Sequence, residues 1–183
     1  MLRRLPFAFV LLALSLPLHA QQRDDNAMSE GEIEQLRESA YFPSDRILVF
    51  IKLLDSRNKR IQDLYAHPRK PGREQDTHDL LDQFTAIADE LNDNLDDYGP
   101  HHKDLRKVLP KLIDATERWS SNLKQPPENP VYDLSRKLAL ESIRDIREEA
   151  THLVEDQKTW FAAHPPAKEP DNVPAREVPH QPS

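Results

Sequence analysis

The segment that decides the fold is residues 44–65, which read SDRILVFIKLLDSRNKRIQDLY. Its apolar residues recur every three or four positions, as they do along one face of an α-helix. The recurring positions are Ile47, Ile51, Leu54, Ile61 and Tyr65. Ser44 is a preferred N-cap residue, and Asp45 suits the positive first turn. Asn58 lies in the gap of the apolar stripe. A polar residue at such a seam position can fix the register of helix packing at a cost in stability, but we expect a partly solvated side chain. The segment predicts a central helix.

The segments on either side of this helix predict four more. A short helix is expected at 29–38, because Ser29 and Glu32 have the spacing of a capping box. Long helices are expected from about 76 to 98, from about 101 to 123 and from 130 to 161, since each carries an apolar stripe of helical spacing. Trp119 and Trp160 lie on these stripes, and both are expected in the core.

Prolines and glycines indicate where the helices end. Pro110 lies inside the helix expected over 101–123 and should kink or divide it. Asn129 and Pro130 form an N-cap followed by proline in the first turn, which is a preferred helix start. The chain has only 3 glycines, whereas sheets with tight hairpins need more of them. The scarcity of glycine therefore favours a helical protein.

The predicted fold is all-α, an up-down antiparallel bundle of about four long helices with a short N-terminal helix. Short connections favour antiparallel neighbours, and they place the 67–76 and 124–130 loops at one end and the 98–102 loop at the other. The bundle domain is expected over 29–163. Residues 164–183 contain six prolines and few apolar side chains, which predicts a disordered proline-rich C-terminal tail. A dimer of such helices remains an alternative arrangement.

The first twenty residues predict a secretory signal peptide. Arg3 and Arg4 precede an apolar run over 7–16, and Ala20 is a small residue suited to cleavage. The run is far shorter than the ~20 residues that a membrane-spanning helix needs. We therefore expect cleavage near Ala20, a flexible segment at 21–28, and an exported protein, periplasmic or extracellular, that is not transmembrane after signal removal.

Composition excludes several classes of function. The chain has a formal net charge of -7, so it is poorly suited to bind nucleic acid through phosphates. It has no cysteine, which excludes disulfides, a cysteine nucleophile and thiolate-bound metal. The fold must be held together by its apolar core alone.

One end of the predicted bundle is expected to be basic. The residues that would form this patch are Arg57, Arg60, Arg69, Lys70 and Arg73. Such a patch suits an anionic partner, either an anionic surface or an acidic envelope protein. The alternative is that these cations complement the negative C-terminal end of a helix and remain solvated.

The opposite end gathers acidic residues and histidines, which are weak candidates for a metal site. These residues are Asp93, Asp96, Asp97, His101 and His102. Carboxylates and imidazoles together can bind hard or borderline cations. The alternative is that Lys103, Arg106 or the histidines neutralise the carboxylates across the turn. We assign no cofactor.

No catalytic motif is present in the sequence. There is no glycine-rich phosphate loop, no helical His-Glu-x-x-His and no suggestive order of serine, histidine and aspartate. The favoured function is therefore an exported, non-enzymatic binding, adaptor or envelope-associated protein, whose partner is another envelope protein or an anionic surface. A metal- or cofactor-carrying bundle is the alternative, and an enzyme of unrecognised class is the third.

Overall fold

The computed structural model describes residues 27–165, which form five α-helices and no strand. The helices are α1 (Glu30–Glu38), α2 (Pro43–Ala66), α3 (Arg73–Tyr98), α4 (Leu109–Leu123) and α5 (Asp133–Ala163). The all-α prediction is therefore confirmed for this part of the chain. The predicted signal peptide, most of the segment at 21–28 and nearly all of the predicted tail lie outside the described residues.

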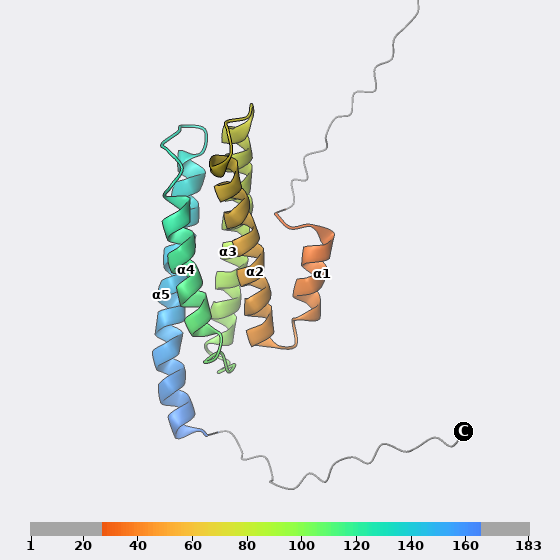
Figure 1. The fold of residues 1–183 in the computed structure, drawn as a ribbon. Coiled ribbons are helices and arrows are strands. Elements are labelled where there is room, and N and C mark those ends of the chain that lie inside the picture. The colour runs from red at the N-terminus through yellow and green to blue at the C-terminus, as the bar shows by residue number, and fades with distance from the viewer. Residues whose placement is uncertain (1–26, 166–183) are drawn as a thin grey trace, which may run out of the picture.

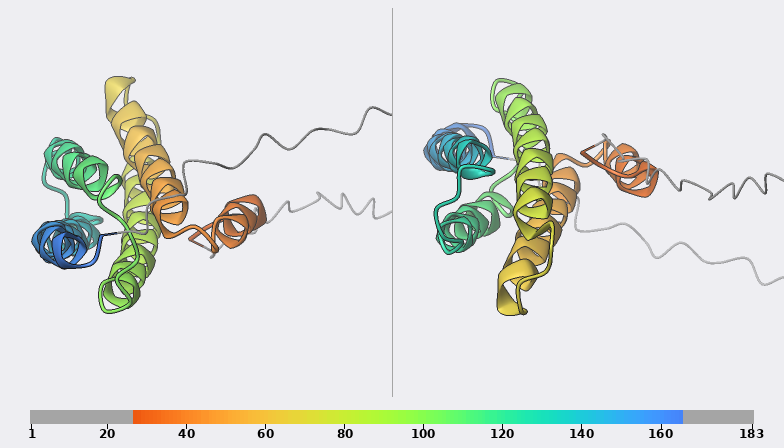
Figure 2. Two further views of the ribbon diagram at one scale, coloured as in Figure 1. Left: turned by 90° about the horizontal axis from the view of Figure 1, so that it is seen from below. Right: turned by 90° about the horizontal axis from the view of Figure 1, so that it is seen from above.

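The four long helices, α2 to α5, pack side by side, and consecutive helices run in opposite directions (Figure 1). We call the end with residues 67–72 and 124–132 the upper end, and the end with residues 39–42 and 99–108 the lower end. Helix α2 contacts α3 and α4, and α5 contacts the same two helices. Helices α3 and α4 are therefore diagonal to each other, and the 99–108 connection crosses the bundle (Figure 2).

This crossing changes which helices are neighbours. The expectation of antiparallel neighbours holds for α2 with α3 and for α4 with α5. It is wrong for α3 with α5 and for α2 with α4, since both of these pairs run in parallel. The physical reason is the length of the 99–108 connection, which is long enough to reach the far corner of the bundle instead of the adjacent one.

The crossing connection is fixed by side chains of two other helices. The buried amide of Gln157 accepts a hydrogen bond from the Leu105 backbone N at 2.9 Å and donates from Nε2 to the Lys103 backbone O at 2.8 Å. On the other side, the Ser44 hydroxyl donates to the Asp104 backbone O at 3.0 Å. These hydrogen bonds take the place of hydrogen bonds to water for backbone groups of the connection.

Several helix ends differ from those expected. Helix α2 begins at Pro43 with Phe42 in the N-cap position, so the prediction of Ser44 as the N-cap is wrong. Helix α4 begins at Leu109, with Pro110 in its first turn, so this proline starts the helix and does not kink it. In each case proline occupies a first-turn position that needs no backbone N–H donor. Helix α5 begins at Asp133, after a turn that follows Asn129.

Trp119 lies at the centre of the core, as the sequence predicts. It is fully buried, and its ring meets Phe84 of α3 edge-on, with 5.7 Å between the ring centroids. Its indole Nε1 donates to the Asp55 carboxylate of α2 at 2.7 Å. One side chain of α4 therefore joins two other helices.

Asn58 is buried, so the expectation of a partly solvated side chain is wrong. It is only 5% exposed, and its side-chain Oδ1 has no hydrogen-bond partner. A buried polar atom without a partner costs stability, because it has lost its bond to water and gained none.

Replacing Asn58 by leucine should therefore raise the free energy of unfolding by about 1–2 kcal/mol, since an apolar side chain of similar shape needs no partner. Asn58→Asp should lower it, because the same site would then hold a charge. Urea unfolding followed by circular dichroism measures both variants. A less stable leucine variant would show that the surrounding core has no room for it.

Candidate functional site

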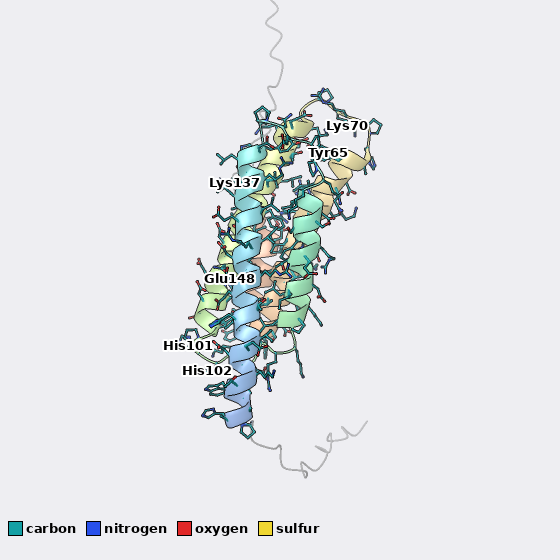
Figure 3. The ribbon with its side chains drawn as sticks, turned by 90° about the vertical axis from the view of Figure 1, so that its left-hand side faces the viewer. Tyr65, Lys70, His101, His102, Lys137 and Glu148 are labelled. Atoms are coloured by element: carbon teal, nitrogen blue, oxygen red, sulfur yellow. The ribbon has the colours of Figure 1, made fainter. Side chains whose placement is uncertain are left out.

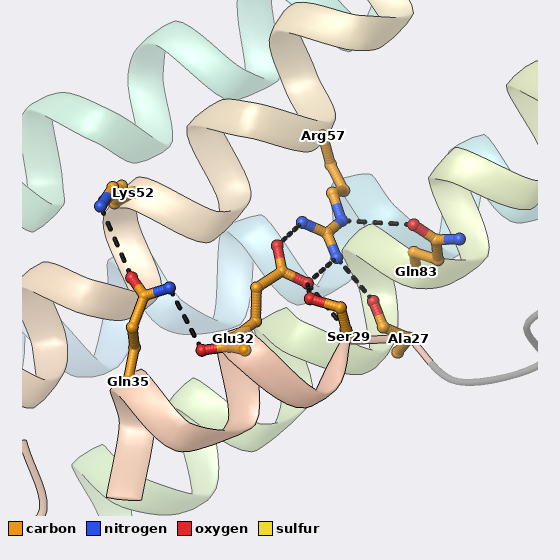
Figure 4. A network of polar contacts seen from close by, with 8 residues as sticks. Ala27, Ser29, Glu32, Gln35, Lys52, Arg57 and Gln83 are labelled. Carbon is orange, nitrogen blue, oxygen red and sulfur yellow. Dashed lines mark hydrogen bonds and ion pairs between the residues drawn. The ribbon is translucent and has the colours of Figure 1, made fainter. Parts of the chain in front are cut away.

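Arg57 does not belong to the exposed basic patch that the sequence predicts. Its side chain is only 5% exposed and points toward α1 instead of the upper end (Figure 4). The guanidinium donates to the Glu32 carboxylate, with one N–O distance of 2.8 Å, and to the Ala27 backbone O at 2.8 Å. Its Nε donates to Gln83 of α3 at 3.2 Å. The sequence-based assignment of Arg57 to an exposed patch is therefore wrong.

Arg57 holds the N-terminal part of the described chain in place. Its hydrogen bonds lower the pKa of Glu32 to about 2, with further help from the Ser29 backbone N–H of the capping box. At the other end of α1, Arg46 donates to the Leu36 backbone O at 3.1 Å. Residues 27 and 28 are partly buried against the core, so the expectation of a flexible segment does not apply to these two.

The remaining cations of the predicted patch are only partly free. Arg69 donates to both carboxylate oxygens of Glu74, at 3.1 and 3.3 Å, and Arg73 lies 3.4 Å from the same carboxylate. The two arginines lower the pKa of Glu74. Arg73 also stacks over the Tyr65 ring, 4.6 Å from its centroid. Among the described residues only Arg60 and Lys70 of the predicted set lack a carboxylate partner.

A groove of about 930 Å³ lies between α2 and α3 at the upper end. Its lining includes three cations and four carboxylates. The cations are Arg60, Lys70 and Arg73, and the carboxylates are Asp63, Asp76, Asp79 and Asp82. Cations and carboxylates are therefore mixed in this groove. The arrangement gives it no preference for an anionic ligand, which also weakens the case for an anionic surface at the upper end.

The acidic residues and histidines of the lower end do not converge. His101 Nδ1 lies 2.6 Å from the Asp97 backbone O and 3.5 Å from its carboxylate, while Asp93 and Asp96 are exposed. His102 stacks on Trp160 instead, with 4.3 Å between the ring centroids. Within residues 27–165 no group of three or more histidine, cysteine or acidic side chains is placed to hold a metal ion.

Trp160 is half-buried, so the expectation that it belongs to the core is wrong. His164 also stacks on its ring, with 4.4 Å between the centroids, and Phe161 meets the ring edge-on at 4.9 Å. Helix α5 ends at Ala163, one residue before the predicted tail, and His164 is its C-cap residue. These ring contacts form an aromatic cluster near the end of α5, which extends past the lower end of α4 (Figure 3).

A second groove, of about 440 Å³, lies beside this aromatic cluster between α4 and α5. Its lining residues are Arg106, Pro110, Val154, Lys158, Phe161 and Ala162. We call it the lower groove. The guanidinium of Arg106 lies 4.0 Å from the centroid of the Phe161 ring and pairs with Asp104 at 2.7 Å.

Sequence reasoning missed the lower groove because its two walls are far apart in the chain. The only available signal was the group of basic residues Lys103, Arg106, Lys107 and Lys111, which follows the histidines. Nothing local connects these residues to Lys158 and Phe161. The diagonal connection and the overhang of α5 bring them together.

In the described part of the chain, no helix combines the length and the apolar character needed to cross a membrane. The chain matches no known protein family, and no curated protein or solved structure shows significant similarity to it.

Proposed function

We propose that this chain is an exported, non-enzymatic helical protein that acts by binding another component of the cell envelope, in the first place an envelope protein. The observation that carries the proposal is the exposure of two adjacent aromatic side chains on a well-packed bundle. Tyr41 is 87% exposed and Phe42 is 64% exposed, in the short link between α1 and α2. Aromatic residues are enriched among those that dominate the energetics of protein interfaces.

A second apolar surface supports the same proposal. Val131, Leu134 and Leu138 are exposed near the start of α5, with spacings of three and four residues. Leu134 and Leu138 lie four residues apart on one face of α5, and Val131 precedes them in the turn before the helix. Apolar residues along one face are the pattern by which a helix contacts a partner helix. A second copy of the chain is one occupant compatible with this face.

The organised polar groups also favour binding over catalysis. Gln157 fixes the crossing connection, Arg57 holds α1, and Asp55 satisfies the indole of Trp119. Each of these groups is engaged in holding helices together, and none faces the two grooves described above. The alternative of an anionic surface at the upper end is weakened by the pairing of Arg57, Arg69 and Arg73 with carboxylates.

The double variant Tyr41→Ser, Phe42→Ser should lose capture of the envelope partner while keeping the melting temperature of the unchanged protein, because exposed side chains contribute little to folding. Cross-linking and affinity capture of the mature chain from its native envelope measures the loss. The double variant Leu134→Ser, Leu138→Ser tests the second surface in the same way. Unchanged capture by both double variants would overturn the proposal.

A further inference from the structure

We propose that the lower groove binds the phosphate-bearing headgroup of an anionic membrane lipid, with part of the acyl chain against its apolar wall. The inference takes the envelope location from the proposed function. It concerns a different surface from Tyr41 and Phe42, so either proposal can fail without the other.

The groove combines two kinds of lining that an anionic lipid requires. Pro110, Val154, Phe161 and Ala162 supply the apolar wall. The cations are Lys158 and Arg106, of which Arg106 also pairs with Asp104 just outside the groove. None of the six lining residues is acidic, in contrast to the four aspartates of the upper groove. A volume of about 440 Å³ is within the range of small-molecule sites.

The positive charge extends beyond the groove itself. Lys107 and Lys111 are exposed and form no ion pair among the described residues. Lys158 has one weak ion pair, 3.9 Å from Glu155. The first turn of α4 begins at Leu109 and adds the positive end of a helix dipole. Three exposed acids lie near these cations in the described part of the chain: Asp104, which pairs with Arg106, Glu155 and Asp114 of α4.

The apolar wall is what distinguishes a lipid from a soluble anion. A free phosphate would bind the cations and would make no contact with the apolar wall around Phe161. A lipid uses both, because its phosphate binds the cations and its acyl chain packs on Phe161 and the other apolar lining residues. Helix α5 extends past the lower end of α4 (Figure 3). Phe161 meets the Trp160 ring edge-on near the end of this helix.

The test is co-sedimentation of the mature chain with vesicles. We expect binding to vesicles of equal parts phosphatidylglycerol and phosphatidylcholine at low salt, and none to phosphatidylcholine alone. The triple variant Lys107→Gln, Lys111→Gln, Lys158→Gln should bind on the order of 100-fold more weakly, because each basic residue near an anionic surface contributes roughly fivefold. Its melting temperature should not change, since these side chains hold no core residue.

The matched control removes the same charge from the upper end, with Arg60→Gln, Arg69→Gln and Lys70→Gln. The two triple variants are compared at physiological salt, where the Debye length is about 8 Å. The two ends are separated by about 36 Å, the length of α2, so the charges of one end are screened from the other. We therefore expect this variant to keep its affinity within about twofold. Equal weakening by both triple variants would assign the binding to net charge and overturn the proposal.

Trp160 supplies a second readout. Because Trp119 is fully buried, a blue shift of the tryptophan emission on binding would report on Trp160. Phe161→Ser should reduce the affinity for anionic vesicles without changing the salt dependence. Inorganic phosphate should not displace the protein from vesicles at matched ionic strength, and displacement would identify a soluble-anion site instead. Failure of the unchanged protein to bind anionic vesicles at low salt overturns the proposal outright.

Discussion

Replacing Trp119 by alanine is expected to lower the free energy of unfolding by about 3–5 kcal/mol, the usual cost of removing a large buried aromatic side chain. The side chain is fully buried, contacts Phe84 edge-on and donates a hydrogen bond to Asp55. Its loss would therefore leave a cavity and a carboxylate without its indole donor. Urea unfolding followed by circular dichroism measures the change.

Two variants separate the contributions of Trp119. Trp119→Phe keeps most of the volume and loses the 2.7 Å bond to Asp55, so we expect a smaller loss of about 1–2 kcal/mol. Trp160→Phe is the matched control at the half-buried tryptophan, with an expected loss below about 1 kcal/mol. Equal losses for Trp119→Phe and Trp160→Phe would contradict the position assigned to Trp119.

The second large effect is the loss of stability in acid through Glu32. Its pKa is lowered to about 2, because Arg57 and the Ser29 N–H hydrogen-bond to the ionised carboxylate. The unfolded chain releases this proton near the ordinary pKa of about 4.3, so the stabilisation is complete above that pH. It should be lost as the pH falls from about 4.5 toward 2, with a magnitude of up to about 3 kcal/mol.

Glu32→Gln should therefore be less stable than the unchanged protein at neutral pH, and the difference should shrink as the pH falls toward 2. Because α1 packs only on α2 among the described helices, part of the effect should appear as faster hydrogen exchange of the α1 amides. Glu38→Gln is the matched control, an exposed carboxylate on the same helix without an ion pair. An equal response of the two variants to pH would contradict the role assigned to Arg57.

Local sequence patterns determined the helical class and most of the core. The apolar spacing over 44–65 predicted α2 without reference to the rest of the chain, and the stripe that contains Trp119 predicted its burial. Helix ends were less accurate. The local sequence around Pro110 is compatible with a proline that interrupts a helix and with a proline that begins one. Which of the two forms depends on the tertiary contacts of residues 99–108.

The burial of Arg57 is known only from the tertiary structure. Its position near the basic residues of α2 predicted exposure, while its actual partners are Glu32, 25 residues earlier, and Gln83 of α3. A guanidinium can be buried only when carboxylate and carbonyl groups replace its water. The residues next to Arg57 in the sequence do not include those groups, so they could not predict its burial.

Helical periodicity and the lack of cysteine are local properties of the sequence, so they predicted the all-helical character of residues 27–165 and the absence of disulfides. The tertiary structure decided that α3 and α4 are diagonal, that Arg57 is buried and that the lower groove joins Arg106 to Lys158. Each of these depends on contacts such as those of Gln157 with Lys103 and Leu105, more than fifty residues away. Such contacts form only when the helices pack together. The apolar spacing along one helix shows which face is buried, but it does not specify which other helices pack on that face.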